Sequence, residues 1–501
     1  MKRRLYAPAV LFAGLLSAQI VATAHVYLSN RDLLQATEAL MRAGYLTVPN
    51  AHVAKQLDSL TTAMAGGLFF TLSVGAGLSM VTLIIVWLWS RVFRCRRKAT
   101  AGFLLIWAAA LVAVNQDGWN VVASVYLVVV PLATAVTAVQ LLPARTPLLS
   151  PVGVFWPVSA AVILALLWSL ALDRHMFTNI RDHLLLGNRI GQSITGAYYT
   201  YTLFPAEAFK SLDQKQIRTL VLGASLNRRD WTRIEQTLRA QDYLPIPAGN
   251  PADLTIGIDS DNNRFSLADS HRTVLKVPEG DLLVRTATTL AGYSQALDRN
   301  RLFRTLTLTC LLVGFPLVLF AFLFSLLGSL PNLFLTVQLS DMIAAILCVL
   351  VGGLLLLPVY QGHRARVSLA ESVDHLSVPS SVGRIAALRQ AYEERQDIAA
   401  EAKNNGLDAS PNVAERYWLA RSLAYAKDPL ARPMLSKLAN DPMPIVACQA
   451  LWAMGERNNR EVIHTLIERI NTSSHWYVQM YTYRSLRKLG WVQPRSPQLS
   501  Y

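Results

Sequence analysis

Residues 341–360, DMIAAILCVLVGGLLLLPVY, run for twenty positions with one charged side chain, Asp341, at the first of them. A helix needs about 20 mostly apolar residues to cross the roughly 30 Å hydrocarbon core of a bilayer. Six other stretches are also long and mostly apolar, although 101–116 is short: 6–28, 64–90, 101–116, 120–142, 152–172 and 302–328. The sequence therefore predicts a polytopic α-helical membrane protein with about seven spans.

The composition of the whole chain agrees with this interpretation. Of 501 residues, 52% are hydrophobic and only 16% are charged, whereas soluble domains usually carry about 25% charged residues. The formal net charge of +15 includes a dense run at 91–98, RVFRCRRK, directly after an apolar stretch. Such a run is the usual orientation signal of membrane proteins, so we expect membrane lipid as a partner and no nucleic acid.

The first apolar stretch has two interpretations. Lys2, Arg3 and Arg4 precede it, and Ala22-Thr23-Ala24 resembles a small-residue cleavage site, so residues 1–28 form either a signal-anchor or a signal peptide. The apolar run is longer than the usual core of about 7–15 residues in a signal peptide. That length favours the anchor.

Sidedness follows by parity from two basic segments, 1–4 and 91–98, if both are cytoplasmic. Residues 29–63, 173–301 and the C-terminal region then lie outside, and 143–151 and 329–340 lie inside. Two arginine clusters oppose this assignment, because basic residues beside membrane spans usually lie on the cytoplasmic side. The clusters are Arg299, Arg301 and Arg304, and Arg364 with Arg366. We expect a multi-pass protein of a bacterial cytoplasmic (inner) membrane, with its soluble domains on the extracytoplasmic side.

The predicted spans contain no Asp, Glu, Lys, Arg or His near their middles. Transporters and intramembrane enzymes commonly need such groups as relays or metal ligands. Gly75-Ala76-Gly77 and Gly352-Gly353 permit close approach of helices, which favours packing over a conduit. The membrane part is therefore predicted as 64–172 (spans two to five) and 302–360 (spans six and seven).

The loop 173–301 reads as a small α/β domain. A buried strand is predicted at Arg218–Ala224, a helix at Arg229–Gln241, and a hairpin from Leu254–Ile258 and Phe265–Leu267. Another strand is predicted at Thr273–Val277. The helices Asp173–Gly191 and Asp281–Arg299 are expected to continue from the fifth span and into the sixth.

Three polar patterns in this loop resemble functional sites and fail their tests. Asp259, Asp261 and Asn263 have the spacing of a calcium loop, but Arg264 and Ser270 stand where Gly and Glu are needed. Gly223-Ala224-Ser225 lacks the full G-x-S-x-G of a nucleophile elbow, and Ser225 beside Asn227 is better read as a helix cap. His175 and His183 lack a third metal ligand. We expect no catalytic residue, no metal and no cofactor. The four cysteines, Cys95, Cys310, Cys348 and Cys448, form no CxxC pair.

Beyond a polar linker at 361–380, residues 381–490 show a helical repeat. Ser422-Leu423, Ala450-Leu451 and Ser485-Leu486 occupy similar places, at offsets of 28 and 35 residues, within the range of solenoid repeats. Asp428-Pro429 and Asp441-Pro442 are predicted to begin helices, since proline suits the first helical turn. Residues 491–501 form a tail.

This region resembles HEAT-type repeats, including the short form of phycobilisome-lyase-like proteins. The resemblance rests on Asp441-Pro442 to Val446 and on Ala450-Leu451-Trp452-Ala453-Met454-Gly455. It implies an α-solenoid whose concave face binds proteins, and it implies no catalytic residues.

Two aromatic clusters are the candidate partner-binding residues. Tyr198, Tyr199 and Tyr201 lie in the loop domain, and Trp476, Tyr477 and Tyr481 lie in the last repeat. Aromatic side chains are common at the headgroup level and as anchors of protein interfaces. For the first cluster, packing at the membrane interface is the alternative to partner binding. For the second, the alternative is a cap on the end of the solenoid.

These observations lead to a ranked set of functional hypotheses. The first is a membrane-anchored scaffold or assembly protein that presents its loop domain and its repeats to protein partners in the same envelope complex. The second is a transporter or a transporter accessory subunit. A membrane-bound enzyme is third, since the loop domain shows no converging acid, base and nucleophile.

Overall fold

The computed structural model describes residues 5–142, 151–223, 228–259, 264–270, 272–369 and 380–496. Lys2–Arg4, Ser225, Asn227 and positions 260–263 of the calcium-like pattern lie outside these ranges, as do residues 370–379 of the predicted linker. The chain divides into two compact units. Unit 1 comprises Met1–Val26, Ala63–Leu184 and Arg299–His363, and unit 2 comprises Tyr27–Thr62, Leu185–Asp298 and Arg364–Tyr501. Each is described by itself.

Unit 1 is built from apolar helices, several of them continued through π-helical turns. Among the described residues, six helical stretches are long and apolar enough to cross a membrane: Tyr6–Arg42 (α1), Leu60–Arg91, Arg97–Val114 (α5), Val121–Gln140 (α6), Arg301–Leu333 and Val337–Ala365. The second stretch joins α3 (Leu60–Phe70), η1 (Thr71–Gly75) and α4 (Ala76–Arg91), and the fifth joins α14 (Arg301–Thr309), η4 (Cys310–Gly314), α15 (Phe315–Ser329) and η5 (Pro331–Leu333). The predicted fifth span corresponds to α7 (Pro151–Ser169), of which Phe155–Ser169 is a shorter apolar helix.

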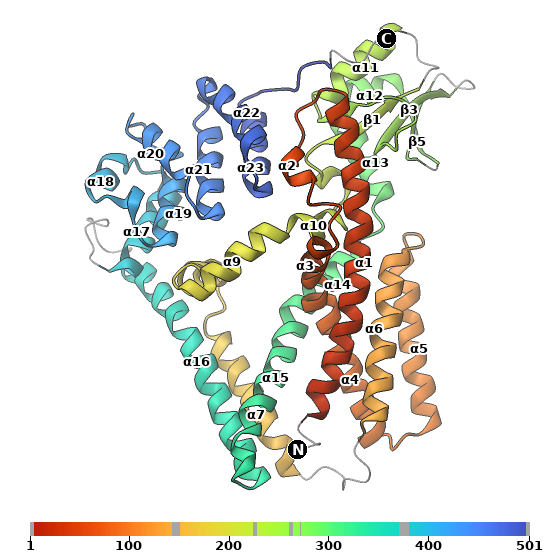
Figure 1. The fold of residues 1–501 in the computed structure, drawn as a ribbon, viewed down its shortest axis with the longest axis vertical. Coiled ribbons are helices and arrows are strands. Elements are labelled where there is room, and N and C mark those ends of the chain that lie inside the picture. Colours follow the sequence, from red (N-terminus) through yellow and green to blue (C-terminus); the bar gives the residue numbers. More distant parts are fainter. Residues whose placement is uncertain are drawn as a thin grey trace. The chain divides into compact units, whose positions relative to one another are not determined.

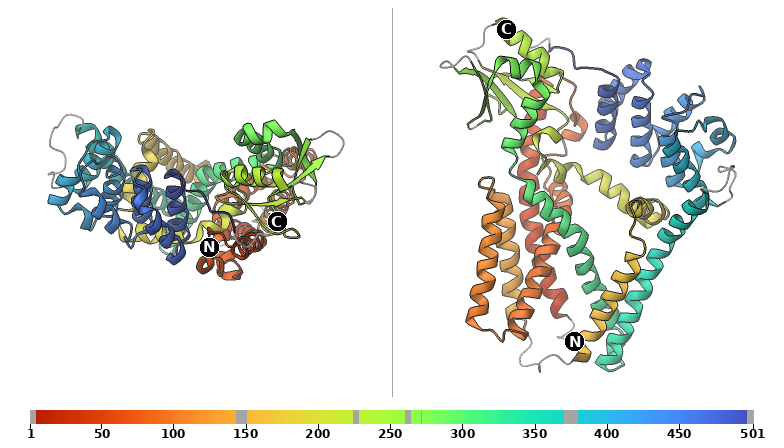
Figure 2. Two further views of the ribbon diagram at one scale, coloured as in Figure 1. Left: turned by 90° about the horizontal axis from the view of Figure 1, so that it is seen from above. Right: turned by 180° about the vertical axis from the view of Figure 1, so that it is seen from behind.

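Small residues bring the helices of unit 1 close together. A Cβ atom on Gly77 would lie 2.2 Å from Cys310 Sγ, and one on Gly314 would lie 2.5 Å from the Cα of Gly77, so the π-helical η4 packs directly on the start of α4. Helices α7 and α16 (Val337–Leu369) run side by side in both views (Figures 1 and 2). A Cβ on Gly352 would lie 2.3 Å from Leu164 Cδ2. Gly353 has no such neighbour within 4 Å, so only the first glycine of the predicted pair is a packing position.

Three buried hydroxyl groups inside unit 1 are satisfied within their own helices. Ser79, Thr134 and Thr307 each donate a hydrogen bond to the carbonyl four residues earlier, at 2.7, 2.7 and 2.8 Å. This is the usual way in which Ser and Thr are accommodated in apolar helices. These side chains therefore need no bound ligand to explain their burial.

The α/β part of unit 2 contains a five-stranded mixed sheet of order β2-β1-β3-β4-β5. The strands are β1 (Arg218–Leu222), β2 (Tyr243–Pro245), β3 (Leu254–Asp259), β4 (Arg264–Ala268) and β5 (Thr273–Pro278). Strand β1 is parallel to β2 and β3, whereas β3, β4 and β5 are antiparallel. Helix α11 (Arg228–Arg239), which the sequence predicts at Arg229–Gln241, connects β1 to β2, a strand that the sequence analysis did not predict.

The two faces of the sheet are covered by different elements. Leu220 and Ile256 pack with Tyr293 of α13 (Thr286–Leu297) in one core, whereas Leu244 packs with Tyr45, which follows α1, in another. Successive side chains of a strand point to opposite faces, so Tyr243 and Leu244 on β2 belong to the two different cores. The end of the first helix is therefore part of the α/β domain's covering layer.

Two helix predictions at the edges of this domain need correction. The expected continuous helix Asp281–Arg299 is two helices, α12 (Glu279–Val284) and α13, because Arg285 departs from helical geometry with φ −108° and ψ 36°. The expected helix Asp173–Gly191 is broken into α8 (Met176–Asn179) and η2 (Ile180–Leu185) before α9 (Arg189–Tyr201) begins. Asn188 causes the new start, since its side chain accepts a hydrogen bond from Gly191 N at 2.8 Å. A five-residue helix, α10 (Leu203–Glu207), and the turn η3 (Leu212–Gln214) follow.

The C-terminal part of unit 2 is a helical solenoid in two layers (Figure 1). One layer stacks α17 (Ser381–Glu394), α19 (Val413–Ser422), α21 (Pro444–Glu456) and α23 (Trp476–Lys488), each packed on the next. The other consists of α18 (Ala399–Asn404), α20 (Ala431–Leu438) and α22 (Ile463–Thr472), with short 3₁₀ turns η6 (Leu407–Ala409) and η7 (Arg460–Val462). We call the first layer the inner layer.

Two of the repeat positions singled out in the sequence, Ser422 and Ser485, make equivalent contacts, whereas Leu451 of the Ala450-Leu451 pair is the acceptor of one of these contacts. Ser422 Oγ donates to Leu388 O at 2.9 Å, and Ser485 Oγ donates to Leu451 O at 2.7 Å. In both cases the hydroxyl joins one inner helix to the inner helix before it. A Cβ on Gly455 would lie 2.9 Å from Ser485 Cα, which explains the glycine in the Met454-Gly455 pair.

Two boundaries in this region differ from prediction. Helices α20 and α21 begin at Ala431 and Pro444, after the Asp-Pro pairs, because both aspartates form turns that precede the helices. Asp428 Oδ1 and Asp441 Oδ1 each accept the amide N–H two residues later at 2.8 Å. In addition, α16 continues to Leu369, so the start of the predicted linker 361–380 is helical.

Candidate interaction surface

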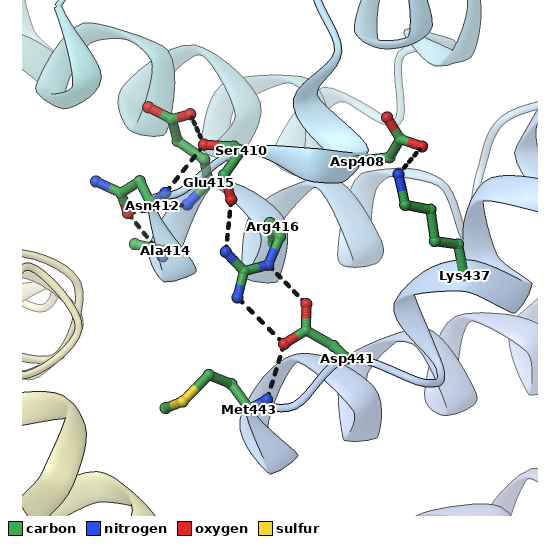
Figure 3. A network of polar contacts seen from close by, with 9 residues as sticks. All are labelled: Asp408, Ser410, Asn412, Ala414, Glu415, Arg416, Lys437, Asp441 and Met443. Atoms are coloured by element: carbon green, nitrogen blue, oxygen red, sulfur yellow. Dashed lines mark hydrogen bonds and ion pairs between the residues drawn. The ribbon is translucent and has the colours of Figure 1, made fainter.

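A polar network fixes the inner layer at α19 (Figure 3). Asn412 caps this helix by accepting hydrogen bonds from Ala414 N at 2.8 Å and Glu415 N at 3.4 Å. Arg416 then joins α19 to the start of α21 through Asp441, at 2.6 Å from Nε to Oδ2 and 3.2 Å from Nη2 to Oδ1. A two-point arginine–carboxylate pair has a defined geometry, so the two inner helices are held in register.

Asp408 anchors the outer layer in the same network. Its carboxylate is buried and accepts a hydrogen bond from Lys437 Nζ at 2.9 Å, with Lys403 at 3.6 Å. Burial alone would raise the pKa of Asp408, but the hydrogen bond and charge of Lys437 and the charge of Lys403 outweigh it and hold the pKa below its ordinary value. The pair of Asp408 with Lys437 joins η6 to α20, so its role is to hold these two elements together.

An aromatic cluster surrounds one arginine on the inner layer. The guanidinium carbon of Arg421 lies 4.3 Å from the ring centre of Tyr392, 5.0 Å from Trp452 and 5.6 Å from Trp418. These rings belong to α17, α21 and α19, so three successive repeats contribute. Tyr425 joins the cluster, with its ring centre 5.7 Å from that of Tyr392. We call these five residues the Arg421 cluster.

The hydrogen bonds of Arg421 go to neutral groups. Its Nη2 donates to Tyr392 Oη at 2.5 Å and its Nη1 to Tyr417 Oη at 3.2 Å, and no acceptor for its Nε occurs among the described residues. The Arg421, Tyr392, Tyr425 and Trp452 side chains are half-buried, so part of the cluster faces outward. A stacked guanidinium that keeps unused donors suits a carboxylate partner.

Sequence analysis did not identify the Arg421 cluster. The signal was present in the repeat spacing, because Trp418 and Trp452 are 34 residues apart and Tyr392 and Tyr425 are 33 apart. Aromatic residues at one repeat's spacing must gather on one side of a solenoid. The search for dense local runs of aromatics could not detect a cluster assembled from three repeats.

The predicted tyrosines of the loop domain divide between two sides of α9. Tyr199 faces the inner layer, with its ring centre 4.6 Å from that of Tyr477, and α9 packs on α21 and α23. Burial raises the pKa of the Tyr199 hydroxyl, and neighbouring Cys448 and Tyr481 raise it further. Tyr198 and Tyr201 are 52% and 40% exposed. The two clusters predicted separately therefore meet through Tyr199.

The predicted aromatics of the last repeat serve mainly internal contacts. Trp476 is buried, and Lys210 Nζ lies 5.2 Å from its ring centre. Tyr477 and Tyr481 are half-buried, with ring centres 6.4 Å apart, and pack on the solenoid core. Of the six predicted site residues, Tyr198 and Tyr201 are the exposed ones.

Two other segments of unit 2 fasten α23. Asn50 Nδ2 donates to the carbonyls of Ile470, Asn471 and Ser473 at 2.8, 3.0 and 3.0 Å, and Asn50 N donates to Gln479 Oε1 at 2.9 Å. From the α/β domain, Asp242 accepts a hydrogen bond from Tyr483 Oη at 2.7 Å and pairs with Arg487 Nε at 3.0 Å. The end of the solenoid is therefore closed by the chain's own residues.

The two histidines considered as metal ligands, His175 and His183, have different neighbours: a Cβ on Gly362 would lie 2.2 Å from the His183 ring. Arg174 Nε lies 2.7 Å from His175 Nε2, and Asp173 Oδ2 lies 3.1 Å from His363 Nδ1. Within the described ranges, no group of three or more His, Cys, Asp or Glu side chains could hold a metal ion.

Comparison with known proteins identifies the repeats. A family model described as HEAT repeats matches residues 405–487, which run from the end of α18 through most of α23. The C-terminal repeats are thus of the HEAT type, as their sequence pattern predicts. The chain matches no curated protein sequence and no solved structure.

Proposed function

We propose that this chain is a membrane-anchored scaffold or assembly protein, and that its HEAT repeats bind a protein partner of the same envelope complex. HEAT repeats are generally protein-interaction modules, and the match to them at 405–487 supports binding rather than catalysis. Six apolar helices are compatible with anchoring in a membrane, which we assign to the bacterial cytoplasmic membrane.

The grouping of segments supports the proposed sidedness. Parity from the basic segments 1–4 and 91–98 assigns residues 29–63, 173–301 and the C-terminal region to one side of the membrane. Most of each of these three segments belongs to unit 2 and takes part in its contacts. Segments that pack together must lie on the same side, and the positive-inside rule makes that side extracytoplasmic.

The observation that carries the proposal is the Arg421 cluster. Interface hot spots are enriched in Trp, Tyr and Arg, and here all three gather on the inner layer of a solenoid. The rings of Tyr392, Tyr425 and Trp452 are half-buried, so a partner can complete their burial. Among the residues that the structure describes, Arg421 donates only to tyrosine hydroxyls, and we therefore propose that the partner segment supplies a carboxylate.

Site-specific photocrosslinking in the full chain, in its native membrane, tests this proposal. A photoreactive amino acid at Trp452 or Tyr425 should form one discrete crosslinked species with a partner. The matched control is Thr465, which is exposed on α22 of the outer layer, and it should form none. Arg421→Gln should lower the crosslinking yield at Tyr425 about tenfold, because a charge-assisted hydrogen bond contributes roughly 1.5 kcal/mol or more. Equal yields at positions 452, 425 and 465 would refute the proposal.

One observation in unit 1 favours a second candidate, a transporter or transporter accessory subunit. His25 and Tyr126 lie 6.1 Å apart between ring centres, beside Phe70 and Phe303. The Tyr126 hydroxyl is buried, with no hydrogen-bond acceptor among the described residues. A proton flux into liposomes that depends on the full chain and is lost in His25→Phe would support this candidate.

A further inference from the structure

Helix α9 exposes a continuous apolar stripe. Ile190, Ile194, Tyr198 and Tyr201 are 76%, 57%, 52% and 40% exposed. At about 100° per residue, these four positions and Ala197 fall within an arc of roughly 100° on the helix. The polar residues Ser193 and Thr200 border the stripe, and both are exposed. The pattern is that of an amphipathic helix whose apolar side is not covered by the chain itself.

The other side of α9 is already occupied. Gly191 and Thr195 are buried, and Tyr199 packs on the solenoid core. The helix contacts α21 and α23 through this side. One helix thus carries a face for the repeats and a second, outward apolar face.

The chemistry of the outward face indicates what covers it. Helix α9 contains no acidic residue, and its only charged side chain is Arg189 at the first position. Isoleucine buries readily in hydrocarbon, and tyrosine, with an apolar ring and a polar tip, is enriched at the membrane–water interface. A helix of this composition lies flat with its apolar side about 5–10 Å into the headgroup boundary.

The position of α9 in the sequence points to the same occupant. The apolar helix α7 ends at Ser169 and α9 begins at Arg189. The connection carries further exposed apolar side chains, Leu170 at 78%, Leu172 at 67% and Phe177 at 64%. The stripe therefore follows a helix of the predicted membrane domain in the sequence, and the connection between the two, which also contains α8 and η2, carries three exposed apolar side chains.

We infer that α9 is an interfacial helix that lies on the lipid surface through Ile190, Ile194, Tyr198 and Tyr201, while Tyr199 on its other side holds the HEAT repeats. The inference rests on the membrane anchoring proposed above. It assigns Tyr198 and Tyr201 of the first aromatic cluster to lipid rather than to a protein partner. It also makes α9 the element that ties the solenoid to the bilayer.

Spin labels on the full chain in nanodiscs of phosphatidylcholine and phosphatidylglycerol test the inference. In a Cys95→Ser background, which removes the exposed native thiol, single labels are placed at Ile194 and Tyr198. The matched control is Ser193, the exposed polar neighbour. The ratio of collisions with oxygen to collisions with a water-soluble nickel complex reports depth. We expect this ratio to be at least threefold higher at 194 and 198 than at 193.

A label at Leu354, 67% exposed on α16, reports the anchoring separately. A lipid-exposed label at 354 with water-exposed labels at 194 and 198 would overturn the interfacial helix and leave the anchoring intact. A water-exposed label at 354 would overturn both. Dipolar broadening between labels at 194 would show that a second copy of the chain covers the stripe. Labels at 194 and 198 that are immobilised and inaccessible to oxygen would show that another protein covers it. Either result would also overturn the inference.

Discussion

Substitution of Asn50 should detach the segment 43–54 from the end of the solenoid. The Asn50 side chain is buried and makes two sets of hydrogen bonds. Its Oδ1 caps α2 (Ala51–Ala54) by accepting from His52 N and Val53 N at 3.1 Å each. Its Nδ2 donates to three carbonyls at the end of α22. An amide group has only two N–H hydrogens, so the three contacts at 2.8–3.0 Å share them.

The expected cost of Asn50→Ala follows from these contacts. Loss of a helix cap costs about 1 kcal/mol, and loss of two hydrogen bonds to buried carbonyls costs about 2 kcal/mol. A total of about 3 kcal/mol corresponds to a roughly 100-fold rise in local opening, because about 1.4 kcal/mol is a factor of ten. Hydrogen exchange of the full chain in nanodiscs should therefore show amides of 463–488 exchanging roughly 100-fold faster.

Two further variants separate the two roles of Asn50. Asn50→Asp keeps an oxygen that can cap α2 but turns a carboxylate toward the carbonyls of α22, so it should accelerate exchange in 463–488 and not in 51–54. Asn459→Ala removes only an exposed cap, whose side chain accepts from Glu461 N at 3.0 Å, and should act locally. If Asn50→Ala accelerated exchange in 51–54 alone, the fastening of α23 by this residue would be refuted.

Three other substitutions have matched or measurable outcomes. Tyr199→Ala should destabilise the attachment of α9 by about 2–3 kcal/mol, since a large part of an aromatic ring leaves the core, whereas Ser193→Ala, at an exposed polar position of the same helix, should change the exchange of α9 amides little. Gly455→Ala should lower the melting temperature through a steric conflict with α23 costing about 1–3 kcal/mol, whereas Gly292→Ala, with no atom within 4 Å of its Cβ, should raise it slightly. Asp408→Asn should cost about 1–2 kcal/mol of folding stability at pH 7. Because the pKa of Asp408 is lowered on folding, the stabilisation by its carboxylate is present above pH 3.8 and is lost as the pH falls through the folded-state pKa. The difference in melting temperature between wild type and variant should therefore shrink at about pH 3.

Local patterns predicted four of the five described strands of the α/β domain and missed β2. The alternation in Leu254–Ile258 and Phe265–Leu267 places them in an antiparallel pair, and Ile256 indeed faces Leu267. The HEAT resemblance likewise came from residues within one repeat, around Asp441-Pro442 and Ala450–Gly455. In these cases the signal and the contact it produces are close in sequence.

Contacts between distant segments could not be predicted in this way. The pairing of Tyr199 with Tyr477 depends on how α9 approaches the repeats, and nothing in either sequence window encodes that approach. The predicted helix Asp173–Gly191 was wrong for a related reason, since the apolar spacing continued while Asn188 offered a stronger local cap for a new start. The predicted span 6–28 ends three residues after His25, whereas α1 extends to Arg42, so this histidine lies within the helix.

The fastening of α23 determines which part of the solenoid is available to a partner. A terminal repeat exposes one apolar side and usually needs a polar cap. In this chain Asn50 covers the junction of α22 and α23, Asp242 holds Tyr483 and Arg487, and Tyr199 covers Tyr477. A partner cannot extend the stack beyond α23 without displacing these contacts. The Arg421 cluster, built on α17, α19 and α21, takes no part in them. Partner binding at the inner layer and closure of the solenoid at its last helix are therefore separate. The crosslinking yield at Tyr425 should be unaffected by Asn50→Asp. A loss of crosslinking at Tyr425 in that variant would mean that the partner binds across the closed end of the solenoid.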